Sequence, residues 1–147
     1  MKPTSIHTAL TGLALALGAG GLWTGLARQP APITVGCSAD TEPYRRVELV
    51  FGLSRKGRPE VAEAEWQSFL DSEVTPRFPD GLSVLAASGQ WRNASGNVIK
   101  EPARLLLVLT KPAPDLEARV AAVRAAWRKA HDQESVLRAE GASCVSF

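Results

Sequence analysis

Apolar and polar positions first alternate at residues 47–53. The apolar positions of this segment are Val47, Leu49, Phe51 and Leu53. A period of two predicts a strand, which Gly57 and Pro59 bring to an end. Apolar residues then recur at helical spacing, with acidic residues on the other faces, at Ala62, Trp66, Phe69, Leu70 and Val74. This pattern predicts an amphipathic helix that ends at Pro76.

The second half of the chain repeats this alternation of strands and helices. Residues 82–92 and 98–110 read as two strands joined by a hairpin loop at 93–97. Pro102 predicts a bulge or an unpaired entry to the second of these strands. The run 105–109 is apolar at every position, as expected for a central strand buried on both faces. Asp115 is a suitable N-cap for a second helix, and residues 136–147 read as the last strand.

The predicted order is strand, helix, strand, strand, helix, strand. Two split βαβ units with right-handed crossovers form an α+β, ferredoxin-like sandwich. We therefore expect a four-stranded antiparallel sheet in the order 4-1-3-2, with both helices on one face. The first and third strands would be central, which agrees with their apolar content.

Two helices cover only one face of such a sheet. Strand alternation assigns Val50, Leu106 and Val108 to the other face, with Glu48 and Arg104 nearby. A face of this kind is too apolar to remain bare in water, so a second copy of the chain, a ligand or the N-terminal arm should cover it. We expect a homodimer through this face, with a ligand cavity at the seam near Arg92 and Arg104.

The N-terminus has the pattern of an export signal. Lys2 precedes an uncharged stretch at residues 9–27, which ends in the small-residue pattern Gly25-Leu26-Ala27. The sequence predicts a signal peptide at 1–27, a proline-containing linker or arm at 28–43, and one domain at 44–147. The protein would be exported to the bacterial periplasm or the exterior and, once cleaved, would have no membrane segment. An uncleaved anchor and lipid attachment at Cys37 are the alternatives.

Cys37 and Cys144 are the two cysteines of the chain, and they stand near the two ends of the predicted domain. In the expected sheet the last strand lies beside the first, so an arm folding back would bring the two residues together. We predict a disulfide between them. The alternative is a pair of unlinked thiols.

Several classes of function are excluded by what the sequence lacks. Removing Lys2 with the signal lowers the formal charge from +2 to +1, which is too small for nucleic-acid binding. One histidine, His131, remains after cleavage, so no histidine-rich metal site is expected. Its place near the end of the second helix favours a capping or solvent-facing role. No phosphate-binding loop or dinucleotide fingerprint is present, and we expect no cofactor.

Three short clusters contain the remaining candidate ligand-binding residues. Arg77 lies in the loop 75–81, where Asp80 is its alternative, purely structural partner. Gln90 and Arg92 flank Trp91 at the end of a strand. Glu134 enters the last strand between two residues that can form hydrogen bonds, in a position that also suits a cap or turn.

Longer motifs stand in order along the domain. They include Phe51-Gly52-Leu53-Ser54, residues 74–82, Gly89-Gln90-Trp91-Arg92, residues 133–138 and Cys144-Val145-Ser146-Phe147. Together they resemble the domain of unknown function 3574, a family of small exported bacterial proteins. The resemblance implies export and a bacterial source, and it carries over neither an activity nor a catalytic residue. Ala62 stands where that family has a helix-capping serine, so a frayed start of the first helix is expected.

Three functions are consistent with these observations. The leading hypothesis is a non-enzymatic exported domain that binds a small molecule or a protein partner through the open sheet face. The second is a cofactor-independent enzyme enclosed by two copies, with Glu134 as base and Arg92 or Arg77 as anion clamp. The third is a structural envelope protein that acts through subunit contacts alone.

Overall fold

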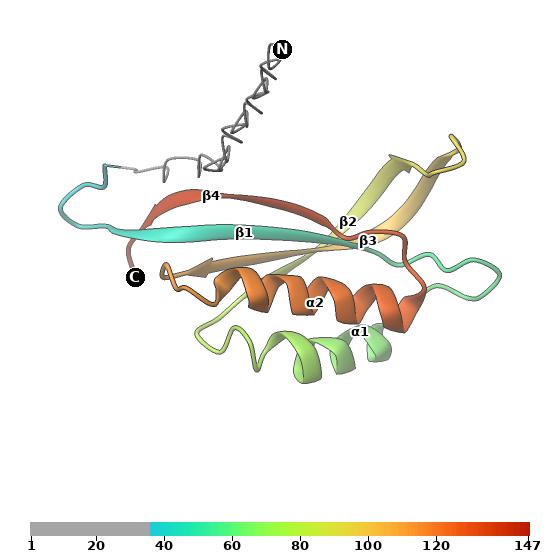
Figure 1. The fold of residues 1–147 in the computed structure, drawn as a ribbon, viewed down its shortest axis with the longest axis horizontal. Helices are drawn as coiled ribbons and strands as arrows, with labels where there is room; N and C mark the ends of the chain where they lie inside the picture. Colours follow the sequence, from blue (N-terminus) through green and yellow to red (C-terminus); the bar gives the residue numbers. More distant parts are fainter. Residues whose placement is uncertain (1–35) are drawn as a thin grey trace, which may run out of the picture. The chain divides into compact units, whose positions relative to one another are not determined.

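The computed structural model describes residues 36–147, so the predicted signal peptide and the first half of the predicted arm lie outside the described residues. Figure 1 shows a sheet with its helices gathered on one side. The elements are β1 (Glu42–Gly52), α1 (Glu63–Phe69), the π-helical turn η1 (Leu70–Val74), β2 (Ser83–Arg92), β3 (Val98–Thr110), α2 (Leu116–His131) and β4 (Leu137–Val145). Among these helices, none is long and apolar enough to cross a bilayer.

The strands form one four-stranded sheet in the order β2-β3-β1-β4. Every pair is antiparallel, and β1 and β3 are central. The predicted α+β, ferredoxin-like arrangement, with its strand order and one-sided helices, is confirmed. The first part of β3, residues 98–102, pairs with β2 alone. This part of the β2–β3 hairpin extends past the rest of the sheet (Figure 1).

Strand β1 begins at Glu42, earlier than the alternation from Val47 predicts. Its first residues pair with β4 and not yet with β3, so Pro43 occupies a stretch with one open side. A proline is tolerated there because its missing N–H is not required on the open side. Pro102 in β3 is tolerated for the same reason, because it pairs with β2 but has no partner in the β1 ladder. Its ladder with β2 keeps one register throughout, and the predicted bulge is therefore wrong.

The core lies between the sheet and the helices. Phe51 of β1 contacts Trp66 and Phe69 of α1 and Trp127 of α2, with ring centroids 5.1–5.7 Å apart. Around these rings pack the buried aliphatic side chains Val47, Leu49, Leu53, Val61, Leu70, Val74, Leu106, Val108, Leu116, Val120, Val123 and Val136. The predicted first-helix stripe therefore faces the core at Trp66, Phe69, Leu70 and Val74, whereas Ala62 is exposed.

The prediction for the faces of β3 is wrong. Leu106 and Val108 are 0 % and 1 % exposed and point toward the helices, while Arg104 lies on the same side and pairs with Glu63 of α1. Val50 and Glu48 do face away from the helices, because they alternate with the buried Val47 and Leu49. Since positions 105–109 are all apolar, this run contains no polar position that would set the phase of the alternation.

Helix termini account for three smaller differences. Glu65 accepts a hydrogen bond from the Ala62 backbone N–H at 3.0 Å, so α1 has half of a capping box although position 62 lacks a hydroxyl. Asp115 has helical backbone angles and makes no capping bond, and its carboxylate pairs instead with Arg119. His131 is buried against Trp127, with ring centroids 4.1 Å apart, and is not the solvent-facing cap that its position suggested.

Cys37 and Cys144 form a disulfide, with Cα atoms 5.5 Å apart and a sequence separation of 107. Cys144 is paired with Pro43 across the β1–β4 ladder. The segment before β1 therefore folds back onto the end of β4, as the topology predicts. The bond closes nearly the whole domain into one loop.

Candidate functional site

The sheet face turned away from the helices, which we call the open face, is rich in leucine. Directly paired residues share a face, so the ladders define its rows. One row runs Leu85, Leu105, Val50, Leu137 across all four strands, and the next contains Ser83, Leu107, Glu48 and Ala139. Leu85 and Leu137 are 48 % and 58 % exposed. The predicted apolar face therefore exists, but it is formed by Leu105, Leu107 and Leu109 of β3 instead of Leu106 and Val108.

A pocket of about 250 Å³ opens on this face where the β2–β3 hairpin leaves the sheet. Its walls come from all four strands and from the segment between α2 and β4. The lining residues are Val50, Gly52, Gly89, Gln90, Trp91, Glu101, Ala103, Gln133, Ser135 and Leu137. We call it the Glu101 pocket, since Glu101 is its carboxylate.

Glu101 is held by two N–H donors. Its Oε1 accepts a hydrogen bond from the indole Nε1 of Trp91 at 2.6 Å, and its Oε2 accepts one from the backbone N–H of Ser54 at 3.1 Å. The residue is 9 % exposed. A carboxylate has acceptor sites on both oxygens, and each is used here. Two neutral donors thus fix the direction of this carboxylate.

Gly52 makes room for the carboxylate. A Cβ added at this position would lie 2.5 Å from both oxygens of Glu101. Any side chain here would therefore push Glu101 away from its two donors. Gly89, on the other side of Glu101, is less restrictive, since its added Cβ would lie 3.7 Å or more from its neighbours, which is ordinary contact.

The segment entering β4 closes another side of the pocket. The Gln133 side-chain amide donates a hydrogen bond to the carbonyl of Ser54, whose N–H binds Glu101. Ser135 lines the same wall. The loop after β1 and the segment before β4 are thereby joined at the carboxylate.

No ion pair within residues 36–147 neutralises Glu101. The same part of the chain contains no group of three or more His, Cys, Asp or Glu side chains that would hold a metal ion. Burying a charge is costly unless a partner compensates it. The Glu101 pocket is therefore a negatively charged and otherwise mainly apolar recess.

The sequence-predicted candidates do not gather at one place. Gln90 lines the Glu101 pocket. Arg92 donates to the Gly96 carbonyl at the hairpin tip, and Arg104 pairs with Glu63 on the helix side at 2.6 Å. Arg77 pairs with Glu73 at 3.0 Å, not with Asp80. Glu134 is exposed and lies outside the lining of the pocket, although both of its neighbours contribute to it.

Sequence reasoning missed Glu101 itself. A usable signal was present in the alternate positions of β3, which are Ile99, Glu101, Ala103, Leu105, Leu107 and Leu109. A single carboxylate in such an apolar row must either reach water or be given partners. Recognising it required the correct phase of this strand.

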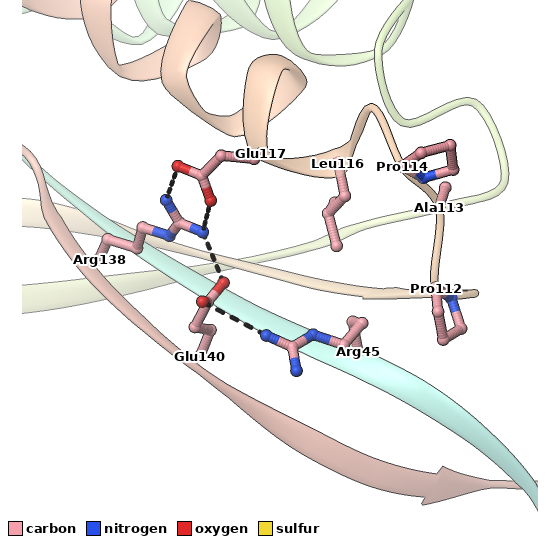
Figure 2. Close-up of a pocket in the computed structure, with 8 residues that line it drawn as sticks. All are labelled: Arg45, Pro112, Ala113, Pro114, Leu116, Glu117, Arg138 and Glu140. Atoms are coloured by element: carbon pink, nitrogen blue, oxygen red, sulfur yellow. Dashed lines mark hydrogen bonds and ion pairs between the residues drawn. The ribbon is translucent and has the colours of Figure 1, made fainter. Parts of the chain in front are cut away.

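A second pocket, also of about 250 Å³, lies on the helix side between the start of α2 and β4 (Figure 2). Here the charges compensate one another. Arg138 binds both oxygens of Glu117 at 2.6 Å and one oxygen of Glu140 at 2.7 Å, and Glu140 also pairs with Arg45 at 3.3 Å. The hydrogen bonds between Arg138 and Glu117 lower the pKa of the Glu117 carboxyl and raise the pKa of the Arg138 guanidinium. We call this the ion-pair pocket, and its arrangement fastens β4 to α2.

Solved structures with related folds have low sequence identity to this chain. A phage SAM lyase in complex with S-methyl-5'-thioadenosine has a TM-score of 0.56 and 13 % identity over 78 % of this chain and 96 % of that one. CutA from Synechococcus elongatus PCC7942 has a TM-score of 0.44 and 15 % identity over 71 % and 82 %. The likeness to the SAM lyase concerns the fold alone.

Among curated proteins, none matches this chain. The family model described as "Protein of unknown function (DUF3574)" matches residues 46–147, which include nearly all of the sheet and both helices. This chain therefore belongs to the DUF3574 family, as its motifs indicate.

Proposed function

We propose that this protein is an exported binding domain that pairs with a second copy of itself through the open face and holds a small molecule in the Glu101 pocket. The observation that carries the proposal is the leucine-rich open face with an uncompensated carboxylate at one end. The Cys37–Cys144 disulfide supports export, because such bonds persist in oxidising compartments.

A second copy suits the open face for reasons of size and charge. The apolar row extends over all four strands, and fully burying an exposed apolar side chain is worth roughly 1.5–3 kcal/mol. Arg46 and Glu48, paired at 2.7 Å on the same face, give each copy both signs of charge. A two-fold axis brings identical patches together, so such a face can complement itself.

The pocket and the interface would be continuous. Val50 and Leu137 belong both to the leucine row of the open face and to the lining of the Glu101 pocket. A second copy seated on this row would border the pocket opening and shield a bound molecule from water. If the protein acted in assembly alone, or as an enzyme, the pocket would have a different role.

An enzyme that uses Glu134 with Arg92 or Arg77 receives no support from the geometry. Arg92 donates to the Gly96 carbonyl at 2.7 Å, and Arg77 pairs with Glu73 at 3.0 Å, so neither arginine is paired with Glu134. The carboxylate that lines a pocket is Glu101, and no arginine lines that pocket. Ligand binding is therefore the function that we propose.

Light scattering on the full chain tests the pairing. Leu107→Glu places a charge beside Glu48 at the centre of the open face and should convert a dimer to a monomer, while circular dichroism stays unchanged. Val84→Glu is the matched control, because Val84 is 37 % exposed on the opposite face of β2. It should leave the dimer intact. A wild-type chain that is monomeric at micromolar concentrations would refute the pairing.

A further inference from the structure

We infer that the Glu101 pocket binds a small organic cation, an ammonium or amidinium group carried on an apolar body. This inference rests on the proposed function, since it names the ligand class of the same pocket. Its first support is the charge of the site. Glu101 is buried and accepts two N–H bonds, and none of the ion pairs formed by residues 36–147 involves it.

The geometry of the carboxylate leaves room for a further donor. A carboxylate offers about four lone-pair sites, and Trp91 and Ser54 occupy two of them. A ligand N⁺–H group directed at Glu101 would make a charge-assisted bond, roughly twice as strong as a neutral one. An anionic ligand would instead be repelled by the same group.

The lining of the pocket indicates the chemistry of the ligand apart from its charged group. Val50, Ala103 and Leu137 present apolar surface, and the indole of Trp91 lines the same space. Aromatic rings attract cations as well as apolar groups. Gln133 and Ser135 add hydrogen-bonding groups to the lining. A volume of about 250 Å³ is below the roughly 300–1,000 Å³ of pockets for drug-sized ligands, so the ligand is small.

A metal ion suits this pocket less well than an organic cation. Divalent ions in proteins take several oxygen or nitrogen ligands. Glu101 is the one acidic residue among the lining residues, and neither histidine nor cysteine is among them. A single carboxylate beside apolar walls matches one ammonium or amidinium group.

Three probes of similar size separate charge from shape. Benzylammonium, benzyl alcohol and benzoate are titrated into the full chain, and binding is followed by calorimetry and by the NMR signal of the Trp91 indole N–H, which contacts Glu101. Benzylammonium should bind at least about tenfold more tightly than the other two, as expected for one charge-assisted bond. Equal binding of benzyl alcohol or benzoate, or no response to benzylammonium at millimolar concentration, would overturn the inference.

Two variants test the residue itself. Glu101→Gln keeps the shape of the side chain and should weaken benzylammonium binding by about tenfold or more. Gly52→Ala should do the same, because its methyl group displaces the carboxylate. Glu140→Gln is the matched control in the ion-pair pocket and should leave binding unchanged. Unchanged binding in a folded Glu101→Gln variant would also overturn the inference, and the three-probe comparison on the wild type decides if neither variant folds.

Pairing and cation binding can fail independently. Light scattering on the same samples reports the oligomeric state, and the titrations report the pocket. A monomer that binds benzylammonium selectively would refute the pairing and support the inference. A dimer that binds none of the probes would refute the inference and leave assembly as the role of the open face.

Discussion

The two faces of the sheet come from the same apolar strands. They differ in how far the rest of the chain covers their apolar side chains and pairs their charges. On the helix face, Leu106 and Val108 are covered by the two helices, and the charges at the margin are paired, as in the network of Arg138 with Glu117 and Glu140. Leu105, Leu107 and Leu109 alternate with Leu106 and Val108 along β3. They lie on the open face, where no helix covers them. Glu101, on the same side, has N–H donors but no cationic partner within residues 36–147.

This difference separates folding from function. On the helix face, the chain itself buries the apolar side chains and pairs the charges. These residues therefore account for the stability of the fold. The open face has apolar surface and a charge without a cationic partner in the described chain, and under the proposed function a second copy and a ligand would cover them. Two pockets of about equal volume therefore differ in their chemistry, because one is internally neutralised and the other is not.

The largest expected contrast lies within β3. Leu106→Ala should lower the free energy of unfolding by about 2–5 kcal/mol, because it leaves a cavity in the core. Leu85→Ala, at a half-exposed position on the open face, should lower it by less than about 1 kcal/mol. Denaturant unfolding measures both values on protein diluted until it is monomeric. Similar losses for the two variants would show that the faces are not distinct.

The second contrast concerns the two carboxylates. Glu101→Gln should cost about 1–3 kcal/mol of stability, because a glutamine amide cannot accept from both Trp91 and Ser54 and leaves a buried donor unmatched. Glu140→Gln should cost less than about 1 kcal/mol, since Arg138 keeps its bidentate bond to Glu117. Thermal and urea unfolding report both. A Glu101→Gln variant as stable as Glu140→Gln would mean that the two N–H bonds contribute little.

A third prediction uses pH on the helix side. Burial lowers the pKa of His131 below its usual 6.5, although Glu65 opposes this shift. The unfolded chain therefore takes up the proton first, and stability that is fully present above pH 6.5 should be lost as the pH falls below it. His131→Gln should flatten the melting temperature between pH 7 and pH 5. A wild-type melting temperature that is constant over this range would contradict the burial argument.

The smallest effect is expected in the ion-pair pocket. Arg138→Met removes the contacts to Glu117 and Glu140 but keeps an unbranched side chain of similar length. Exposed and half-exposed ion pairs contribute little, so the loss should be at most about 1 kcal/mol and should shrink further in high salt. Urea unfolding at low and high ionic strength measures it. A loss above that of Leu106→Ala would reverse the ranking of packing over charge on this face.

Much of the fold could be predicted because local periodicity and chain order carry it. The helical stripe through Trp66 and Phe69, the break at Pro76 and the hairpin loop at 93–97 each follow from local chemistry. The disulfide followed from the neighbourhood of β1 and β4. These features depend on residues close together in the chain or on a topology with few alternatives.

The site was harder to predict because it depends on phase and on distant contacts. The run 105–109 offers no polar residue to tell one face from the other, so Leu106 was assigned to the wrong side. Glu101 meets Ser54, which is 47 residues earlier in the chain, and no local pattern reports that contact. Near β4 the prediction missed by one residue, since Gln133 and Ser135 line the pocket and Glu134 does not.

The Cys37–Cys144 bond makes nearly the whole domain a covalent ring. Its two linked residues are 107 positions apart, and both helices and all of the β2–β3 hairpin lie inside the ring. A single protease cut at the exposed hairpin tip, residues 94–97, would therefore open the ring without releasing a fragment. The two halves would remain tied through sulfur and through the sheet. One nick at this loop would therefore not be enough to separate the domain into two pieces.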